Sequence, residues 1–584
     1  MTEANTTSGR PFRPSAPAKG DVRGSFERGR ASPRGVVWFG FQSFWGHLRH
    51  FVASAIATED IDSRDWMTPD DPRELAARLV SALGGQPATG SVVEDLGRDL
   101  WIDYVADTGD DASVSAAVAR LMVAEYELPD PDRPGEYGVA PRGDVLLFGG
   151  DTAYPVATAQ EITNRVLVPF NRVLEERADG RARVLLGIPG NHDWYDGLDG
   201  FGRMFRRRET GEAEPRPSVM GVSKRMLEHY GEWARELVRG GKVDKPAALV
   251  LAGYTPIQNA SYFILPLTSG IHLTAVDRQL KTLDARQRRF HQEWHRLHPE
   301  AASWVLLPDP LYHFGVPSRT GTEMIEALRL DFDAREHFLL SGDVHHYERL
   351  AHDRVLHVIA GGGGAFLHPA PMIDGRLRAD VRWPSLAQSR VLLAQVPWKV
   401  ALGRSGFMPH AALALLFAPA ILFGVRHYER LGLILSAPIV MVLIVGLIYL
   451  LVGGVRKHLL RIAALAFGAA ALTSGIPVVA SLLLGRLFAR LHFQPGAWVM
   501  AAVSLIVAVF AGAWVFGLYL SLLTRFGLEQ MQSFAALDHP GFKHFLRLRV
   551  RADGKGIDAW CLGLSDPLRA GERPVLVDAF RWKP

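Results

Sequence analysis

The sequence predicts an α/β domain joined to a segment of membrane-spanning helices. Two observations predict this fold class. Between residues 95 and 400, short apolar runs alternate with helical patterns, and each run ends in Gly, Pro or Asp. After residue 407, four long apolar runs follow one another. Buried strands with polar residues at their carboxyl ends are typical of layered α/β folds, which build active sites there.

Composition excludes several other classes of protein. At 584 residues the chain is longer than one ordinary domain. Its net charge is only +4 and no dense basic helix is present, so a nucleic-acid partner is not expected. The single cysteine, Cys561, excludes an internal disulfide framework and fits a reducing compartment.

The N-terminal region precedes the α/β pattern. Residues 1–34 are rich in Pro, Gly, Ser and Arg without an apolar core, which predicts a disordered arm and no secretory signal. Residues 35–94 are predicted to form an amphipathic helical lead-in. The stretch 36–57 is aromatic but carries His47, Arg49 and His50 in its middle. We expect it to lie on the bilayer surface or on the domain.

The predicted α/β domain covers residues 95–400. Its candidate strands are DLWIDYVAD, GDVLLFGGD, RVLLGIPG, GIHLTAVD, SWVLLPD, EHFLLSGD and RVLHVIAGG. Between them, Phe290, Trp294 and Leu297 have the spacing of an amphipathic helix. His272 and Asp277, in GIHLTAVD, are interpreted as structural residues.

Residues 407–525 predict four transmembrane helices, at about 409–425, 431–452, 463–485 and 497–523. Each run approaches or exceeds the length needed to cross a bilayer, and none has Asp, Glu, Lys or Arg in its core. That lack argues against an ion pathway. The distribution of Lys and Arg in the loops predicts that both termini, and therefore the α/β domain, are cytoplasmic. Residues 526–584 alternate in polarity and turn at Asp553–Gly554, which predicts a small C-terminal β unit.

Polar side chains gather where the predicted strands end. The stretches that carry them supply Asp107 and Asp110, Asp151 and Tyr154, Asn191, His192 and Asp193, and Asp343, His345 and His346. Carboxylate, amide, phenol and imidazole groups at one sheet edge suit a pair of divalent or transition-metal ions, namely Mn, Fe or Zn, with Mg as a further choice.

In order and type, these motifs resemble those of the calcineurin-like metallophosphoesterases, in the variant seen in purple acid phosphatases. The family pattern is DxG…GDxxY…GNHD…VxxH…GHxH. This chain reads Asp107-Thr108-Gly109, Gly150-Asp151-Thr152-Ala153-Tyr154, Gly190-Asn191-His192-Asp193, Val305-Leu306-Leu307-Pro308 and Gly342-Asp343-Val344-His345. The resemblance covers roughly residues 95–370 and implies a four-layer α/β/β/α sandwich with a metal centre at the strand ends.

The resemblance also implies a role for each residue. Asp107 is placed as a ligand of the first metal, and Asp151 as the bridging carboxylate. Tyr154 is placed as the phenolate ligand and His345 as the closing histidine. Asn191 is placed as the amide ligand of the second metal, and His192 as the general acid or transition-state stabiliser. In this scheme a metal-activated hydroxide attacks phosphorus.

Two positions depart from the family pattern, and both belong to the second metal site. Pro308 stands where the family has a histidine, and Asp343 where it has another. The site could then be weaker, or recruit further ligands. The candidates are Asp110, Asp309, His313, His346 and His368, the last of which follows the run Gly361 to Gly364.

The sequence thus predicts a membrane-anchored phosphoesterase. Its substrate would be a phosphate ester, including one held at the bilayer surface such as a lipid headgroup or a lipid-linked diphosphate. Arg206 and Arg207, in a long polar insertion, could bind the substrate phosphate or anionic lipid, or form a solvated loop. The alternative function is a catalytically degenerate membrane scaffold or sensor that retains the fold.

Overall fold

We analysed a computed structural model of the whole chain. The structure describes residues 35–41, 43, 68–131, 133–207, 248–279, 283–372, 377–426, 431–453, 458–492, 496–529 and 531–584. The predicted arm at 1–34, most of the predicted helix at 36–57 and most of the insertion after residue 207 lie outside these ranges.

The first of two large sheets has seven strands. Their order is β18 (Val575–Trp582), β17 (Ile557–Leu564), β16 (Lys543–Val550), β1 (Leu100–Val105), β4 (Val145–Phe148), β5 (Arg183–Gly187) and β6 (Tyr254–Pro256). Strands β1, β4, β5 and β6 are parallel, whereas β16, β17 and β18 form an antiparallel meander. A tight turn at Asp553 and Gly554 joins β16 to β17.

The second large sheet also has seven strands. Their order is β15 (Val381–Trp383), β13 (Tyr347–His352), β14 (Val355–Ala360), β12 (His337–Ser341), β9 (Ala302–Leu307), β8 (Ile271–Ala275) and β7 (Phe263–Pro266). The four central strands β14, β12, β9 and β8 are parallel. Two short ribbons complete the β structure, β2 (Tyr126–Asp130) with β3 (Arg133–Ala140) and β10 (Tyr312–His313) with β11 (Val316–Pro317).

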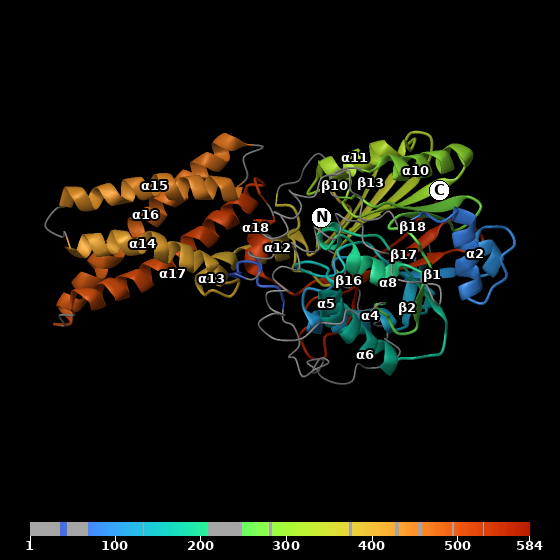
Figure 1. Cartoon of the computed structure of the whole chain (residues 1–584), viewed down its shortest axis with the longest axis horizontal. Coiled ribbons are helices and arrows are strands. Elements are labelled where there is room, and N and C mark those ends of the chain that lie inside the picture. Colours follow the sequence, from blue (N-terminus) through green and yellow to red (C-terminus); the bar gives the residue numbers. More distant parts are fainter. Residues whose placement is uncertain are drawn as a thin grey trace, which may run out of the picture.

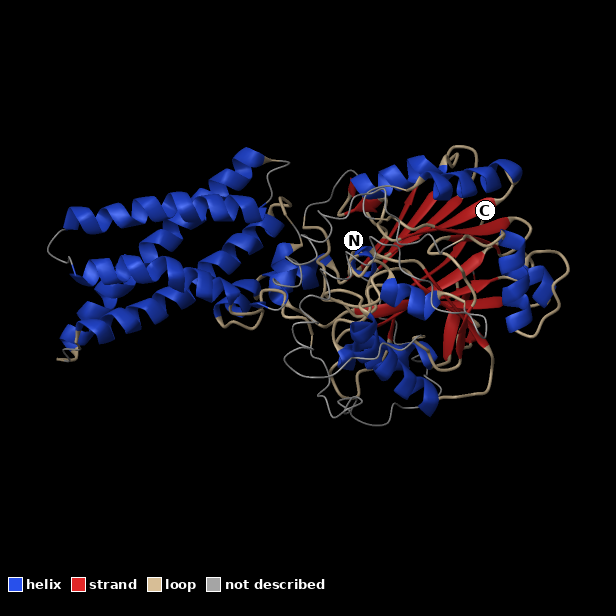
Figure 2. Cartoon of the chain, in the orientation of Figure 1, coloured by secondary structure: helices blue, strands red, loops and turns tan. Residues whose placement is uncertain are grey.

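Helices cover the sheets and extend the chain on one side (Figures 1 and 2). Those of the α/β region are α2 (Pro72–Ala82), α3 (Val92–Leu96), α4 (Ala112–Val123), α5 (Ala159–Ile162), the π-helical turn η2 (Thr163–Leu167), α6 (Val168–Glu176), α7 (Asn191–Trp194), α8 (Asp199–Phe205), α10 (Ala285–Leu297) and α11 (Arg319–Leu328). The remainder are α12 (Leu386–Leu393), α13 (Val396–Ala401), α14 (Met408–Arg426), α15 (Leu431–Gly453), α16 (Leu459–Arg490), α17 (Ala497–Arg525) and α18 (Gln532–Leu537).

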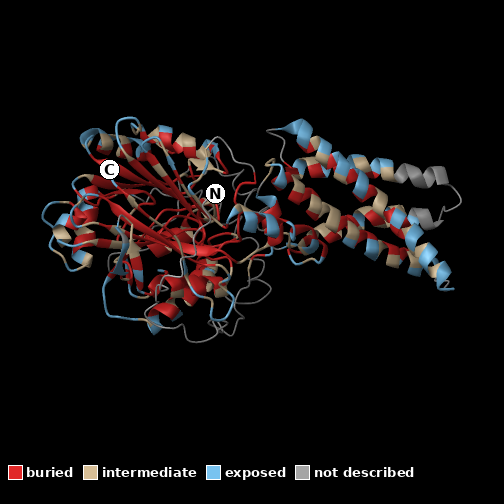
Figure 3. Cartoon of the chain, turned by 180° about the vertical axis from the view of Figure 1, so that it is seen from behind, coloured by how far each residue is buried: buried red, intermediate tan, exposed pale blue. Residues whose placement is uncertain are grey.

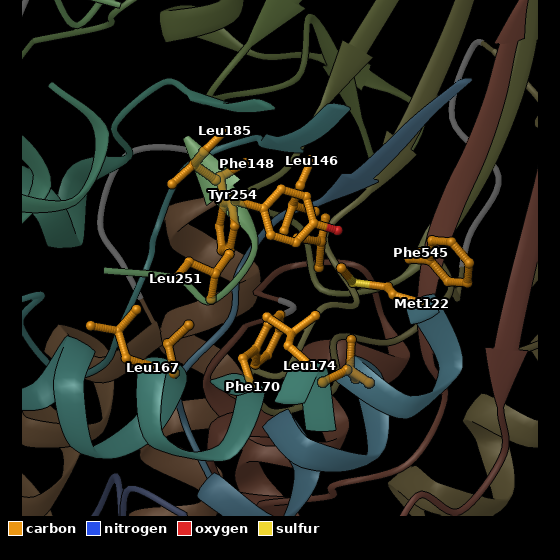
Figure 4. Close-up of a cluster of buried hydrophobic side chains, with 14 of the residues drawn as sticks. Met122, Leu146, Phe148, Leu167, Phe170, Leu174, Leu185, Leu251, Tyr254 and Phe545 are labelled. Carbon is orange, nitrogen blue, oxygen red and sulfur yellow. The ribbon is translucent and has the colours of Figure 1, made fainter. Parts of the chain in front are cut away.

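Three apolar clusters explain how these layers pack. One contains strand residues from both sheets, including Tyr104, Leu147, Trp304 and Leu340, so the sheets pack on each other through it. A second lies between the first sheet and helices α4 and α6 (Figure 4). A third lies between the second sheet and α11. Burial of the apolar strand faces is the main force holding the layers together, and the predicted mixed α/β class is confirmed.

The C-terminal residues do not form a separate small unit. Strand β16 pairs with β1 from Leu546 to Val550, and more than 400 residues separate the two strands in the sequence. Arg547 of β16 is fully buried and donates to both carboxylate oxygens of Asp103 on β1. The chain therefore leaves the α/β region, forms the helical bundle and returns to complete the first sheet.

Helices α14 to α17 form an elongated bundle beside the α/β region (Figures 1 and 3). In the described residues two of them, α16 and α17, are long and apolar enough to cross a membrane. The described apolar parts of the other two are shorter, Met408–Leu422 and Pro438–Gly453. The structure therefore supports two candidate spans, where the sequence predicts four.

Candidate metal centre

The parallel strands bring the predicted site residues to one edge of the fold. Asp107 follows β1, Asp151 follows β4 and His192 follows β5, three adjacent strands of the first sheet. Asp343 and His345 follow β12 of the second sheet. Because carboxyl ends of parallel strands meet at one edge, residues more than 200 positions apart converge there.

Three aspartates hold an unusual backbone conformation. Asp107, Asp151 and Asp343 have φ angles of 57°, 49° and 65°. This left-handed region is costly for residues with a Cβ, although aspartate tolerates it better than most. Such positions concentrate at functional sites because the surrounding structure must enforce them.

Glycines allow the chain to pass close to these carboxylates. A Cβ placed on Gly190 would lie 2.1 Å from Asp151 Oδ1, and one on Gly361 would lie 2.6 Å from Asp107 Oδ2. The glycine run that begins at Gly361 thus brings the protein's own backbone against Asp107, since Ala365 N donates to the carbonyl oxygen of Asp107. These positions must be glycine because a larger residue would collide with the carboxylates.

Three buried side chains converge around the hydroxyl of Tyr154, which is itself buried. Its oxygen lies 2.9 Å from Asp107 Oδ1, 3.1 Å from Asp151 Oδ2 and 3.1 Å from His345 Nε2. His345 Nε2 lies 3.4 Å from Asp107 Oδ1. Each of the four residues is at most 4% exposed. One hydroxyl proton cannot satisfy three acceptors, so the set has an excess of lone pairs.

The spacing of these atoms fits the donor set of one metal ion. Oxygen and nitrogen ligands about 2.1 Å from a metal lie roughly 3 Å from each other when they are adjacent in an octahedron. Within the described residues, no group of three or more His, Cys, Asp or Glu side chains is positioned to hold a metal ion. A metal ion at this point would need the phenol oxygen of Tyr154 as a ligand in addition to Asp107, Asp151 and His345.

His345 is oriented as a ligating histidine. Its Nδ1 lies 2.7 Å from the carbonyl oxygen of Phe366. A carbonyl oxygen only accepts, so Nδ1 carries the ring proton and Nε2 presents its lone pair to Tyr154 and Asp107. This support by a second hydrogen bond is typical of histidines that bind metals. His368 stacks on the His345 ring and accepts the His345 backbone N–H at 2.9 Å.

Burial dominates the electrostatics of the cluster. It raises the pKa of Asp107 to about 8, and together with Asp107 it raises the pKa of Asp151 well above its ordinary value. Burial lowers the pKa of His345 to about 3. A nearby cation stabilises the charged form of buried carboxylates and the neutral form of imidazole. The cluster therefore has the electrostatics of a cation site.

Asn191 and His192 lie at the half-buried rim. The His192 backbone N–H donates to Asp151 Oδ1 at 2.8 Å, and its ring packs 4.4 Å from the Tyr154 ring. His192 Nδ1 lies 2.7 Å from the carbonyl oxygen of Pro155, so Nδ1 carries a ring proton. The Asn191 amide donates to the Tyr195 hydroxyl at 3.0 Å.

The candidate second-metal residues have other partners. Asp309 pairs with Arg278, Nη1 to Oδ1, at 2.7 Å. Asp110 accepts the backbone N–H of Val36, and His346 lies 3.4 Å from Glu348. His313 lies on the β10–β11 ribbon, where its ring packs on Phe314.

Arg206 and Arg207, predicted to bind the substrate phosphate, line a different cavity. That cavity has a volume of about 480 Å³ beside the edge strand β6, and Arg78 and Arg203 also line it. Its lining includes none of Asp107, Asp151, Tyr154 and His345.

Three residues at the site were not found from the sequence. Trp38 packs its ring against Tyr154, His192 and Phe366. Lys543, fully buried at the start of β16, donates to the carbonyl oxygen of Ala365. Arg278 follows β8. The only signal for it was a basic residue directly after the carboxyl end of a predicted strand.

Comparisons with known proteins add little. No protein-family model matches the sequence, and no curated protein matches it. Among solved structures, the chain is similar to GAP50, the anchor in the inner membrane complex of Plasmodium, with 12% identity over 46% of this chain and 72% of that one and a TM-score of 0.26. It is similar to PhoD with 12% identity over 46% of this chain and 58% of that one and a TM-score of 0.22. At these TM-scores the similarity gives no information about the function of this chain.

Proposed function

We propose that the protein is a membrane-anchored, metal-dependent phosphoesterase. The observation that carries this proposal is the convergence of Asp107, Asp151, Tyr154 and His345 on one point, with His192 beside them. The order of the motifs, which resembles that of metallophosphoesterases, supports the same activity and the four-layer sandwich that goes with it.

The residues divide the chemistry among them. Asp107, Asp151, Tyr154 and His345 would hold the metal, which supplies a Lewis acid and a lowered pKa for water at the site. The bond from His192 N to Asp151 fixes the backbone of His192 against the cluster. The Nδ1–H of His192 donates to the carbonyl oxygen of Pro155 and keeps its proton there. A proton for the leaving oxygen would therefore come from Nε2 of the imidazolium, which would return to the neutral Nδ1–H tautomer.

The helical bundle is the proposed membrane anchor, with all four helices α14 to α17 spanning the bilayer. Large apolar side chains on its surface are exposed, among them Leu415, Leu443, Leu460 and Ile506. Exposed apolar side chains on all four helices are rare on a soluble protein and suit contact with lipid.

The candidate metal centre lies at the end of the sheets that faces the bundle. Strand β16 begins at Lys543, six residues after α18 ends, and Lys543 contacts the loop that holds His345 in place. A phosphate ester held at the bilayer surface, such as a lipid headgroup or lipid-linked diphosphate, is therefore the proposed substrate class.

Purified full-length protein tests the activity. It is stripped of metal, reloaded separately with Mn, Fe, Zn and Mg, and assayed with p-nitrophenyl phosphate and bis-p-nitrophenyl phosphate. We expect turnover that requires metal and falls at least a thousandfold in Asp151→Asn, which keeps the size of the side chain. Asp144→Asn, at the other end of β4, is the control and should keep activity.

The same experiment distinguishes the phosphoesterase from the alternative function. Binding of metal without turnover of either ester would favour the degenerate scaffold or sensor, for which the loss of a family histidine at Pro308 is the supporting observation. No binding of any metal and no turnover would contradict the phosphoesterase.

A further inference from the structure

Arg278 lies among the carboxylates that a second metal ion would need. It comes three residues after the end of β8, beside β9 and β12 in the second sheet. Asp309 follows β9 and Asp343 follows β12. Since these three strands are parallel neighbours, Arg278, Asp309 and Asp343 emerge side by side at the site edge.

The charges around Arg278 are those of a cation site. Its Nη1 makes a 2.7 Å ion pair with Asp309 Oδ1. Burial lowers the pKa of Arg278, but Asp309, Asp343 and Asp151 more than offset this, and the pKa is raised above its ordinary value. The guanidinium is thus attracted to three carboxylates, of which Asp151 is also a member of the metal cluster.

The expected ligands of a second ion are occupied or missing. Pro308 has no donor atom to replace the family histidine. The Asn191 side-chain amide donates to the Tyr195 hydroxyl at 3.0 Å. A divalent ion placed here would meet a fixed positive charge competing for the same carboxylates.

We propose that the Arg278 guanidinium takes the place of a second metal ion and binds the phosphoryl oxygens of the substrate, so that the site holds one ion. This inference rests on the proposed phosphoesterase function. No bond to Arg278 forms or breaks, because its role is to bind and neutralise negative charge.

The guanidinium is suited to this role. It has five N–H donors in a planar fork that matches phosphate oxygens, and it stays charged at all physiological pH values. In the described part of the chain, Asp309 engages one nitrogen, and the side chain is 20% exposed. Asp309 holds Nη1, and the other guanidinium nitrogens are the donors that would bind a phosphate.

Metal content and phosphate affinity test the proposal without turnover. Metal per chain is measured by mass spectrometry after dialysis, and inorganic phosphate binding by calorimetry on the metal-loaded, full-length protein. We expect one ion per chain in the natural protein and in Arg278→Ala. Phosphate affinity should fall about ten- to a hundredfold in Arg278→Ala, and less in Arg278→Lys, which keeps the charge but loses the fork.

The variant Arg278→Ala/Pro308→His restores a histidine and removes the competing charge. We expect it to bind a second ion, which Pro308→His alone should not. Arg98→Ala is the matched control, because Arg98 makes a 2.8 Å pair with Asp144 at the opposite end of the sheet and should leave both measurements unchanged.

The outcomes are distinguishable. Two ions per chain in the natural protein would overturn the role of Arg278 alone. So would an unchanged phosphate affinity in a folded Arg278→Ala variant whose melting temperature matches that of Arg98→Ala. No bound ion in the natural protein overturns the phosphoesterase function together with it.

Discussion

Gly361 approaches the Asp107 carboxylate so closely that no side chain fits between them. A Cβ there would lie 2.6 Å both from Asp107 Oδ2 and from the carbonyl oxygen of Val344. Asp107 sits in a left-handed backbone conformation and has little freedom to move aside. Its position therefore depends on the absence of a side chain at residue 361.

Gly361→Ala should displace Asp107 and weaken the metal centre. We expect metal affinity to fall at least tenfold, with a matching loss of turnover, as measured by titration with the metal ion. Gly270→Ala is the matched control, because a Cβ there meets nothing within 4 Å. Equal metal affinity in both variants would contradict the account of the glycine run.

Residues of the site differed in how far the sequence alone could reveal them. Asp107, Asp151, Tyr154 and His345 could be predicted because motif order and spacing mark the ends of successive strands. Trp38 and Lys543 could not, because their neighbours at the site are more than 100 positions away in the chain and no local pattern marks them. Arg278 also stood in no motif, and its role depends on which strands are neighbours.

A buried ion pair joins strand β16 to strand β1. Arg547 donates to Asp103 and also to the carbonyl oxygens of Met122, Ala124 and Ala140. Arg547→Met should leave the Asp103 charge buried without its partner. The expected loss of stability is about 3–5 kcal/mol, seen as a lower melting temperature.

The double variant Arg547→Met/Asp103→Leu is the control for that prediction. It removes both charges together, so we expect it to recover most of the stability that the single variant loses. A double variant as unstable as Arg547→Met would show that the pair's charges are not the cause.

His272 on β8 makes stability depend on pH. It accepts the indole N–H of Trp294 at 3.1 Å, and burial, with a contribution from His298, lowers its pKa to about 4. The unfolded chain binds a proton near pH 6.5, so the stabilisation is complete above that pH and is lost as pH falls towards 4. The loss should be about 2 kcal/mol at pH 5.

His272→Gln keeps an acceptor for Trp294 and removes the titration. We expect the drop in melting temperature between pH 7 and pH 5 to be smaller in this variant. An unchanged drop would contradict the role of His272 in acid sensitivity.

The sequence predicts the strands better than it predicts how they pair in the sheets. The apolar runs that end in Gly, Pro or Asp correspond to β1, β4, β5, β8, β9, β12 and β14. The position of β16 could not be predicted, because periodicity shows that a segment is a strand without showing its partner. Its partner, β1, lies on the far side of the whole helical bundle in the sequence.

Across the whole molecule, α12 and α13 connect the α/β region to the bundle. They pack on the last third of α17, where Ser521 donates to the carbonyl oxygen of Leu393 and Pro397 lies against Gly517. The twenty residues from Trp498 to Gly517 span about 28 Å of helix, close to the thickness of the hydrocarbon core.

The exposed side chains on α12 and α13 and in the turn that follows them fit a membrane–water boundary. They include the apolar Val391, Trp398, Leu402 and Phe407 together with Arg390 and Arg404. Aromatic and basic residues concentrate at that boundary in membrane proteins. We therefore expect this surface to lie at the lipid headgroups and to hold the metal centre near them.

A fluorescent probe on Leu402→Cys tests this placement. In vesicles with brominated lipids its emission should be strongly quenched. Leu297→Cys on α10 is the control, because Leu297 is 55% exposed against 56% for Leu402, and it should not be quenched. Cys561 is fully buried and should not react with the probe. Equal quenching at both positions would contradict the placement.

The central claim is that Asp107, Asp151, Tyr154 and His345 bind a catalytic metal. Anomalous diffraction from crystals of the metal-loaded protein tests it most directly. The account predicts a peak within about 2.0–2.3 Å of one donor atom from each of these four side chains. With Mn, Fe and Zn each supplied, no peak among these four residues would contradict it.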